Sequence, residues 1–229
     1  MPIHRTLNQN FFKKWSPEMA YVLGFFAADG NMIRNNRGAH FIAFYSNDKE
    51  LLEKIRNLLG SNHKLAPKKR NKFYKNRKQS YQLQIGSKEI FNDLINLGMT
   101  PNKSLILEMP NMPEELLGHF LRGHFDGDGC VYFRKNWAKD RNKLRWVFQV
   151  RFTSGSKQFL EGLHSSLKSI KICKGGYLYE KNRAYELIFS HNDGFALFRL
   201  MYDNISSDIY LERKYKIFQK ASLVLNMRA

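Results

Sequence analysis

Two aspartates at matching positions are the residues of this sequence best suited to chemistry. Asp29 and Asp128 each stand directly before a glycine, at the ends of two similar segments offset by 99 residues. Both segments are expected to be helices, and the negative end of a helix dipole adds to the charge of each carboxylate. Two such carboxylates brought together need a cation, and hard oxygen ligands prefer Mg²⁺. A metal held by two carboxylates keeps positions for water and phosphate oxygens, which suits hydrolysis of a phosphodiester.

Small residues in the same two segments predict how the carboxylates meet. Gly24 and Ala28 are four residues apart in the first segment, and so are Gly123 and Gly127 in the second. Residues at this spacing share one face of a helix. Such a face lets two helices approach more closely than the usual separation of about 8–10 Å. We therefore expect the two helices to pack together and to bring the two aspartates side by side.

The repetition continues downstream, so the chain reads as two copies of one unit. Lys49-Glu-Leu-Leu-Glu-Lys-Ile returns as Lys157-Gln-Phe-Leu-Glu-Gly-Leu, and Tyr81-Gln-Leu-Gln-Ile returns as Tyr185-Glu-Leu-Ile-Phe. We expect residues 1–110 and 111–229 to form two tandem αββαββα halves related by a pseudo-two-fold axis, with the aspartate-bearing helices at the centre. Because the strands come in adjacent pairs, the expected fold class is α+β with mainly antiparallel sheets.

The expected elements follow the same order in both copies. Ser16-Pro17-Glu18 is typical of a helix start, and Met112-Pro113-Glu114-Glu115 opens the second copy in the same way. Strand pairs are expected at 31–35 and 39–46, and at 131–134 and 144–154, the latter around a longer basic loop. Helices are expected at 48–59 and 156–170, and further strands at 64–68, 81–86, 176–180 and 184–190.

The charge of the chain indicates a polyanionic partner. The 229 residues include 38 Lys and Arg against 20 Asp and Glu, a formal net charge of +18, and a field of this size concentrates nucleic acid around the protein. Two cysteines are too few for a disulfide framework, the N-terminus lacks an apolar signal core, and no apolar run approaches a membrane span. We expect an intracellular protein with no membrane contact, in a bacterial cytoplasm or an organelle.

The two aspartate segments also carry a family resemblance. Leu121-Arg-Gly-His-Phe-Asp-Gly-Asp-Gly129 and Leu23-Gly-Phe-Phe-Ala-Ala-Asp-Gly30 resemble the motifs of the LAGLIDADG homing endonucleases in their single-chain form, and the similarity extends from about Pro17 to about Lys220. The resemblance implies a monomeric, Mg²⁺-dependent enzyme with no obligate protein partner. Its substrate would be double-stranded DNA, cut at a long asymmetric target, and its gene would lie in a mobile intron or stand alone.

The resemblance assigns the metal site by motif position. The metal-binding, strand-cutting aspartates fall on Asp29 and Asp128, with the preceding Ala28 and Gly127 beside them in the site. Mn²⁺ or Ca²⁺ can occupy such a site as well as Mg²⁺. The first motif has Ala27 where the family often has an earlier Asp, but that earlier position is not the metal ligand in the family.

Two lysines are the candidates for a supporting role. In relatives, a lysine near the end of each copy orders the hydrolytic water network, and Lys103 and Lys214 stand in segments that look like those of the family. Arg213 competes with Lys214 for this role.

Other polar residues near the motifs are weaker candidates. Asn47 and Ser154, at the ends of equivalent strands, match positions where relatives often place a polar side chain near the metal waters. His119 and His124 flank the second motif and invite a metal-ligand interpretation, but neither has a counterpart in the first copy. We do not expect these histidines to bind metal.

The resemblance further implies that the two sheets form a concave saddle over the DNA major groove. Basic residues at strand ends and hairpins are expected to contact phosphates and to give salt-dependent affinity. Polar side chains on the strands are expected to read the bases, because Arg suits guanine and Gln suits adenine. The candidate DNA-binding residues are Arg34, Arg37, His40, Lys68, Lys69, Arg70, Lys72, Tyr74, Lys75, Arg77, Gln82, Gln84, Arg134, Lys135, Lys139, Arg141, Lys143, Arg145, Gln149, Arg151, Lys181 and Arg183.

Two alternative functions stay open at this point. One is a maturase that binds its own group I intron RNA and assists splicing, and the other is a non-catalytic DNA-binding regulator on the same fold. Retention of both aspartates argues against the regulator, because a binding protein gains nothing from two carboxylates that repel each other. Self-excision as an intein is not expected, because only about fifteen residues precede the first motif helix.

Overall fold

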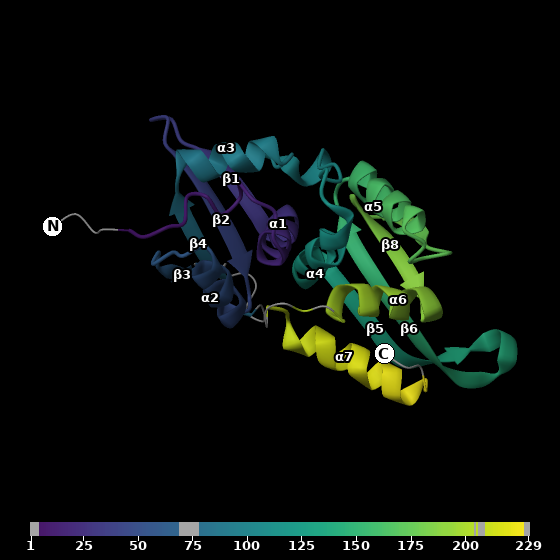
Figure 1. The fold of residues 1–229 in the computed structure, drawn as a ribbon. Coiled ribbons are helices and arrows are strands. Elements are labelled where there is room, and N and C mark those ends of the chain that lie inside the picture. The colour runs from purple at the N-terminus through teal and green to yellow at the C-terminus, as the bar shows by residue number, and fades with distance from the viewer. Residues whose placement is uncertain (1–4, 69–77, 204, 206–208, 227–229) are drawn as a thin grey trace.

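Each half of the chain forms one four-stranded antiparallel sheet with its own set of helices (Figure 1). The structure, a computed structural model, describes residues 5–68, 78–203, 205 and 209–226. The first half contains α1 (Pro17–Asp29), β1 (Gly30–Arg34), β2 (His40–Ser46), α2 (Lys49–Leu58), β3 (Leu65–Pro67), β4 (Tyr81–Gly86) and α3 (Lys88–Asn96). The second half contains α4 (Leu117–Asp128), β5 (Gly129–Ala138), β6 (Lys143–Ser154), α5 (Lys157–Ser169), β7 (Tyr177–Lys181), β8 (Ala184–Ser190) and α6 (His191–Tyr202).

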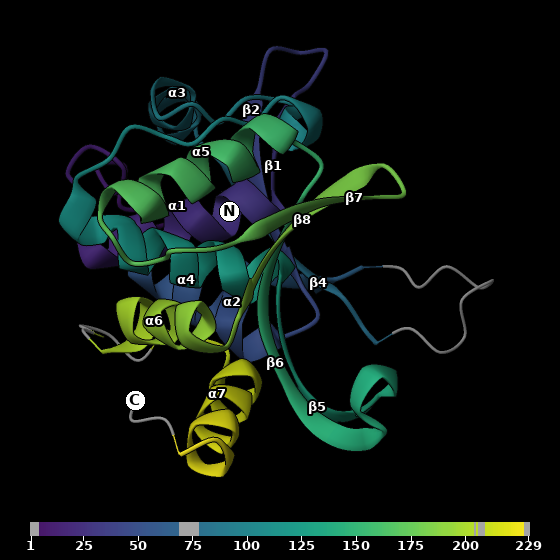
Figure 2. The same cartoon turned by 90° about the vertical axis from the view of Figure 1, so that its right-hand side faces the viewer.

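The two sheets have the same topology. Their strand orders are β1-β2-β4-β3 and β5-β6-β8-β7, and the register agrees as well, since Gly30 pairs with Phe44 as Gly129 pairs with Phe152. The helices gather on one side of the molecule and the strands on the other (Figure 2). The predicted αββαββα repeat and the α+β fold class are therefore confirmed. One further helix, α7 (Glu212–Val224), follows the second repeat.

The two motif helices begin differently. Ser16 caps α1 as predicted, and its Oγ accepts a hydrogen bond of 3.1 Å from the Met19 N–H. In the second half, the predicted start at Pro113 is wrong, because a 3₁₀ turn, η2 (Glu114–Leu116), comes first and α4 begins at Leu117. Leu116, which precedes α4, makes no side-chain capping hydrogen bond. A tighter turn at a helix start is a common way to satisfy the first amide groups without a capping side chain.

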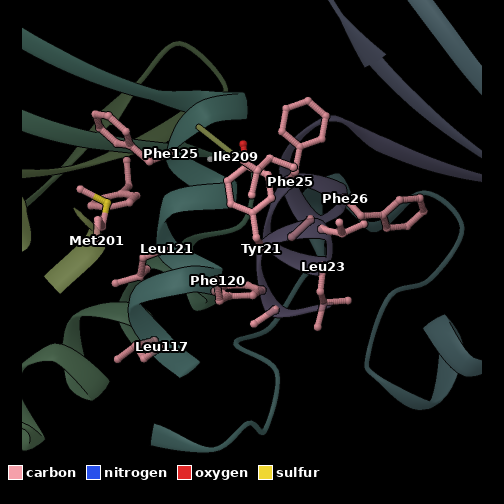
Figure 3. Close-up of a cluster of buried hydrophobic side chains, with 14 of the residues drawn as sticks. Tyr21, Leu23, Phe25, Phe26, Leu117, Phe120, Leu121, Phe125, Met201 and Ile209 are labelled. Carbon is pink, nitrogen blue, oxygen red and sulfur yellow. The ribbon is translucent and has the colours of Figure 1, made fainter. Parts of the chain in front are cut away.

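Helices α1 and α4 pack against each other at the centre of the molecule (Figures 1 and 3). A methyl group added to Gly24 would lie 2.0 Å from the Phe120 carbonyl oxygen, and one added to Gly123 would lie 2.0 Å from the Tyr21 carbonyl oxygen. These two contacts are equivalent under the repeat. Phe25, Phe120 and other buried apolar side chains surround the pair (Figure 3). The predicted close pairing of the two helices is thus confirmed, and it depends on glycine at both positions.

The hairpin of β5 and β6 is longer than the sequence suggested. A basic loop was expected after Arg134, but the ladder continues to the pair Ala138 and Lys143, and a single 3₁₀ turn, η3 (Lys139–Arg141), closes it. The reason is cross-strand packing, since the rings of Phe133 and Trp146 stack at 4.4 Å. Such aromatic pairs stabilise adjacent strands. The hairpin curves away from the body of the second sheet (Figure 2).

None of the helices in the described ranges is long and apolar enough to cross a membrane.

Candidate active site

The two motif aspartates occupy the last positions of α1 and α4. Because the helices pack face to face, Gly127 lies against Ala28, and a methyl group on Gly127 would lie 3.3 Å from Oδ2 of Asp29. Burial raises the pKa of Asp29 to about 7, and the negative charge of Asp128 adds to the effect. Asp128 lies nearer the surface, and partial desolvation raises its pKa too. The structure therefore brings the predicted carboxylates within electrostatic reach of each other.

Two buried lysines lie at equivalent places beside these carboxylates. Lys103, in the 3₁₀ turn η1 (Lys103–Leu105), donates its ammonium to the carbonyl oxygen of Gly30. Lys214, in the first turn of α7, donates to the carbonyl oxygen of Gly129 at 2.7 Å and to that of Asp126 at 3.1 Å. Only 5% of Lys103 and 4% of Lys214 is exposed, so both ammonium groups are directed at the C-terminal ends of the motif helices.

The electrostatic environment of both lysines is unusual. Burial lowers the pKa of Lys103 to about 8, while Asp128 and Asp29 oppose the change. The pKa of Lys214 is also lowered to about 8 by burial, against the attraction of Asp126. Amines with such pKa values can exist in both protonation states near neutral pH, as groups that hold or move a proton do.

Arg213 differs from Lys214 in where its side chain lies. Arg213 is exposed and lines a pocket of about 370 Å³ together with Asp29, Asn47 and Lys78. Only Lys214 reaches the backbone of the motif helix. Of the two competitors, Lys214 is therefore the structural counterpart of Lys103.

Asn47 and Ser154 lie at the ends of equivalent strands, but the residue that corresponds to Ser154 in the first half is Ser46. Ser46 pairs with Tyr81 in the first sheet as Ser154 pairs with Tyr185 in the second. The two serines also share a role, because each Oγ accepts a hydrogen bond from the N–H two residues later. The counterpart of Asn47 is Gly155, where an added methyl group would lie 2.5 Å from the Ser104 carbonyl oxygen. The second half therefore has a glycine, without a polar side chain, where the first half has Asn47.

The two histidines of the second motif, His119 and His124, are buried and, among the residues that the structure describes, do not lie in a cluster of metal-binding side chains. The ring of His124 lies 4.7 Å from that of Phe159, and burial lowers its pKa to about 3. His119 lies 3.1 Å from the Arg122 guanidinium through Nδ1. In the described part of the chain, no three His, Cys, Asp or Glu side chains cluster so as to hold a metal ion. A cation at Asp29 and Asp128 would therefore have two protein carboxylates, and its remaining ligands would be carbonyl, water or phosphate oxygens.

The first sheet presents part of the expected DNA-binding set on its open face. Leu83 is buried under the helices, so its neighbours Gln82 and Gln84 face outward, and they share a hydrogen bond of 2.8 Å. Lys68 lies with its ammonium 3.9 Å from the ring centre of Tyr45. Arg37 is exposed in the turn between β1 and β2.

Two residues expected on that face lie on the other one. His40 packs edge-on against Phe91 of α3, with ring centres 4.7 Å apart, and so faces the helices. Arg34 has the same strand parity as the buried Met32 and is paired with His40. The prediction of the open face is therefore wrong for both residues, and Arg34 is exposed because it lies at the end of the sheet. Lys69, Arg70, Lys72, Tyr74, Lys75 and Arg77 lie outside the described residues.

The second sheet presents a basic open face. Phe148, Val150 and Phe152 are buried, so Arg145, Gln149 and Arg151 point outward, as the alternation predicted. Arg151 donates to Oε1 of Gln149 at 2.6 Å and lies 3.9 Å from Glu186. Lys181 approaches the same Glu186 at 3.4 Å. Five further candidates lie on outward strand positions, in the hairpin or in turns: Arg134, Lys139, Arg141, Lys143 and Arg183. Lys135 lies on the other face of the sheet, with its ammonium 5.2 Å from the ring centre of Trp146.

One polar cluster beside the site was not predicted. Tyr21, Arg122 and Asp126 are buried between the motif helices and the start of α7, where Tyr21 donates to Asp126 at 2.7 Å. The available signal was an arginine and an aspartate four residues apart in an otherwise buried helix, because buried charges are seldom without partners.

Solved structures of similar fold bind DNA. A crystal structure of the meganuclease I-SmaMI bound to uncleaveable DNA is 15% identical and covers 93% of this chain and 92% of its own, with a TM-score of 0.61. The LAGLIDADG meganuclease I-AabMI bound to uncleaved DNA is 14% identical over 93% of this chain and 91% of its own, also with a TM-score of 0.61. At these identities the likeness shows the fold alone.

A curated sequence is more similar over a shorter stretch. The probable translation initiation factor IF-2 of Methanocaldococcus jannaschii is 30% identical in an alignment of 149 residues that covers 62% of this chain and 11% of that protein. The chain thus matches about a tenth of this relative, whose activity as a whole protein does not transfer.

The family itself follows from a match that covers both halves. The model of the LAGLIDADG-like domain matches residues 16–96 and again residues 115–201. Each match contains one motif helix and the sheet that follows it. With two paired motif helices, two equivalent sheets and the fold of the single-chain meganucleases, the chain belongs to the LAGLIDADG-like domain family.

Proposed function

We propose that this protein is a site-specific double-strand DNA endonuclease that uses divalent metal ions, with Mg²⁺ as the physiological ion. The single observation that carries the proposal is the meeting of Asp29 and Asp128 at the ends of the paired helices. Burial and the charge of Asp128 raise the pKa of Asp29 to about 7. Such an unfavourable arrangement of like charges suits a site that takes up a cation.

The donor set fits a hard divalent cation. Two carboxylates supply charge, and the paired helix ends leave room for oxygen ligands from water and from a DNA phosphate. When bound, such ions polarise the phosphate and lower the pKa of the attacking water. Lys103 and Lys214 hold the carbonyl oxygens at the ends of the motif helices, and their pKa values of about 8 suit a role in ordering the attacking water or passing a proton once DNA is bound.

The open faces of the two sheets support a duplex DNA substrate with an asymmetric sequence. Gln82 and Gln84 face outward on the first sheet, while Gln149 and Arg151 face outward on the second. Gln suits adenine and Arg suits guanine in the major groove. Because the two faces differ in residue type, the two halves of the target are expected to differ in sequence.

Substitution of each aspartate tests the proposal. Asp29→Asn and Asp128→Asn each remove one carboxylate and should abolish double-strand cleavage while DNA affinity in the absence of metal stays the same or rises. The measurement is Mg²⁺-dependent linearisation of a plasmid that carries the uninterrupted sequence of the host gene, or of plasmids from a randomised site library. Glu161→Gln, on the exposed side of α5, is the matched control. Unchanged cleavage by either Asn variant would refute the assignment of that aspartate, and tight binding of intron RNA without DNA cleavage would favour a maturase.

A further inference from the structure

Three polar residues are buried where the motif helices meet the second half. By the offset of 99 residues, each one replaces an apolar residue of the other motif helix. The pairs are Tyr21 with Phe120, Arg122 with Leu23, and Asp126 with Ala27. Since the apolar residues occupy equivalent places in the same pair of helices, helix packing does not itself require the polar ones.

Burial of these groups is costly unless it serves something else. Asp126 is 3% exposed and Arg122 is 1% exposed. Ionised groups in such places lose their hydration and need several hydrogen bonds to compensate. Within the described residues, Oδ1 of Asp126 has no hydrogen-bond partner, so its other oxygen carries the interactions.

The contacts of the two charged residues show what they hold. Oδ2 of Asp126 accepts hydrogen bonds from the Tyr21 hydroxyl at 2.7 Å and from the Leu211 N–H at 2.9 Å. Arg122 donates to the carbonyl oxygen of Met201 at 2.6 Å and to that of Ile209 at 3.3 Å. Met201 lies in the last turn of α6 and Ile209 precedes α7. In Figure 3, Met201 lies on the side of α4 away from Tyr21, and Ile209 lies near Tyr21. Side chains of the motif helices thus hydrogen-bond to the backbone that leads from α6 into α7.

Among the described residues, the start of α7 has no capping side chain of its own. Leu211 is its cap residue and makes no side-chain capping hydrogen bond. The Asp126 carboxylate, supplied from another helix, accepts the Leu211 N–H, as the Glu or Gln at the third helical position does in a capping box. Lys214 follows three residues later, so the position of Leu211 sets where the Lys214 ammonium lies. The segment of Lys103 is held differently, by a hydrogen bond of 2.6 Å from the Ser156 hydroxyl to the Leu107 carbonyl oxygen.

We propose that Asp126, supported by Tyr21 and Arg122, is a positioning residue that fixes the start of α7 and so directs Lys214 to the ends of the motif helices. The catalytic consequence rests on the proposed nuclease function, but the placement of Lys214 does not. The two parts can therefore be tested separately.

Acetylation of lysines tests the placement without any DNA. The intact protein is treated briefly with sulfosuccinimidyl acetate, and the modification rates of Lys214 and Lys103 are read by mass spectrometry. Asp126→Ala should raise the rate at Lys214 by about tenfold, because a hydrogen bond to a charged group is lost, while the rate at Lys103 stays unchanged. Asp126→Asn keeps an acceptor for the Leu211 N–H and should keep Lys214 protected.

Three results would overturn the placement: protection of Lys214 in Asp126→Ala, equal exposure of Lys103, or equal exposure of Lys214 in Asp126→Asn. If Asp126→Ala does not fold, Tyr21→Phe removes one hydrogen bond from the same carboxylate. It should raise the rate at Lys214 by roughly threefold, and an unchanged rate would count equally against the proposal.

Strand-resolved cleavage tests the consequence. Lys214→Met and Lys103→Met should slow opposite strands, since each lysine lies against a different motif helix. Asp126→Ala should slow the same strand as Lys214→Met, and combining the two should add little. Equal slowing of both strands by Asp126→Ala would refute a role through Lys214. A wild-type protein that cuts no DNA would refute the nuclease function and leave the acetylation result to decide the placement.

Discussion

Asp29 carries a charge that the protein accommodates poorly on its own. Its pKa of about 7 lies well above the ordinary value of 3.8, because the carboxylate is desolvated and faces Asp128. A group whose pKa is raised on folding gives stability that is present below the ordinary pKa and lost as the pH rises through the folded value. The metal-free protein therefore loses this contribution between pH 3.8 and about 7.

Removal of the Asp29 charge should stabilise the metal-free protein. At pH 8, Asp29→Asn is expected to raise the free energy of unfolding by roughly 2 kcal/mol, with a matching rise in Tm, and the gain should vanish near pH 4. Added Mg²⁺ should raise the Tm of the wild type and have a smaller effect on the variant. Thermal unfolding followed by circular dichroism at both pH values measures this. Asp140→Asn, at an exposed carboxylate, is the control, and a variant less stable than the wild type at pH 8 would contradict the argument.

At this scale the sequence predicts the residues that repeat. Asp29 and Asp128 stand out because a duplicated segment marks both of them. The link between Asp126 and Leu211 was out of reach, because it joins residues 85 positions apart and involves a backbone N–H that no side-chain pattern reveals. The orientation of His40 failed for a related reason, since its ring is held by Phe91 of a helix rather than by its own strand.

The pairing of α1 and α4 is the element that places the chemistry. Gly24 and Gly123 each face a backbone carbonyl of the other helix, so the helix axes approach as closely as backbone contact allows. A larger residue at either position must push the helices apart, since no flexible side chain is available to move. The aspartates at the helix ends would then separate as well.

Gly24→Ala and Gly123→Ala should therefore destabilise the protein to a similar degree, by about 3 kcal/mol each. Each should also reduce the stabilisation that Mg²⁺ gives, because the carboxylates no longer meet. Urea unfolding with and without Mg²⁺ measures both effects. Gly175→Ala is the control, since its added methyl group would meet only the Asp193 carboxylate at 3.0 Å. Full tolerance of alanine at Gly24 or Gly123 would show that the helices are not in backbone contact.

The long hairpin of β5 and β6 shows where prediction of elements from sequence fails. Polar residues between Arg134 and Lys143 read as a loop, because polar composition is typical of loops. The ladder instead persists, with the Phe133 ring stacked on Trp146 of the neighbouring strand and Trp137 paired with Leu144. Cross-strand pairing of this kind depends on register, which is visible only once both strands are placed.

The basic tip of this hairpin should contribute to DNA affinity through phosphates. Replacing Lys139, Arg141 and Lys143 with Gln should lower the slope of log affinity against log salt by roughly 2 to 3, at about 0.9 per phosphate contact. Fluorescence anisotropy with duplex DNA over a range of salt concentrations measures the slope. The matched control replaces Lys157, Lys168 and Lys220, which are exposed on the helices, and should leave the slope unchanged. Equal effects of the two sets would indicate a response to net charge alone.

The molecule as a whole is a repeat whose two copies are not equal. The sheets and motif helices match closely, but the position of Asn47 is occupied by Gly155 in the second half. The buried polar residues Tyr21, Arg122 and Asp126 likewise correspond to apolar residues in the other motif helix. The fold follows from what the copies share. The differences concern residues beside the two aspartates and on the open faces, so we expect them to distinguish the two DNA strands and the two halves of the target.

Because α1 is buried on every side between Met19 and Ala27, neither half should be stable as a monomer. A fragment of residues 1–110 alone exposes this apolar helix and is expected to aggregate or to pair with itself through Gly24. When it is co-expressed with residues 111–229, a one-to-one complex should form in preference, because only the mixed pair makes the bond of 2.7 Å from Tyr21 to Asp126. Size-exclusion chromatography with light scattering identifies these species. A soluble monomeric fragment that unfolds cooperatively would mean that each half is an independent domain, and that the helix pairing which joins the aspartates forms after folding rather than as part of it.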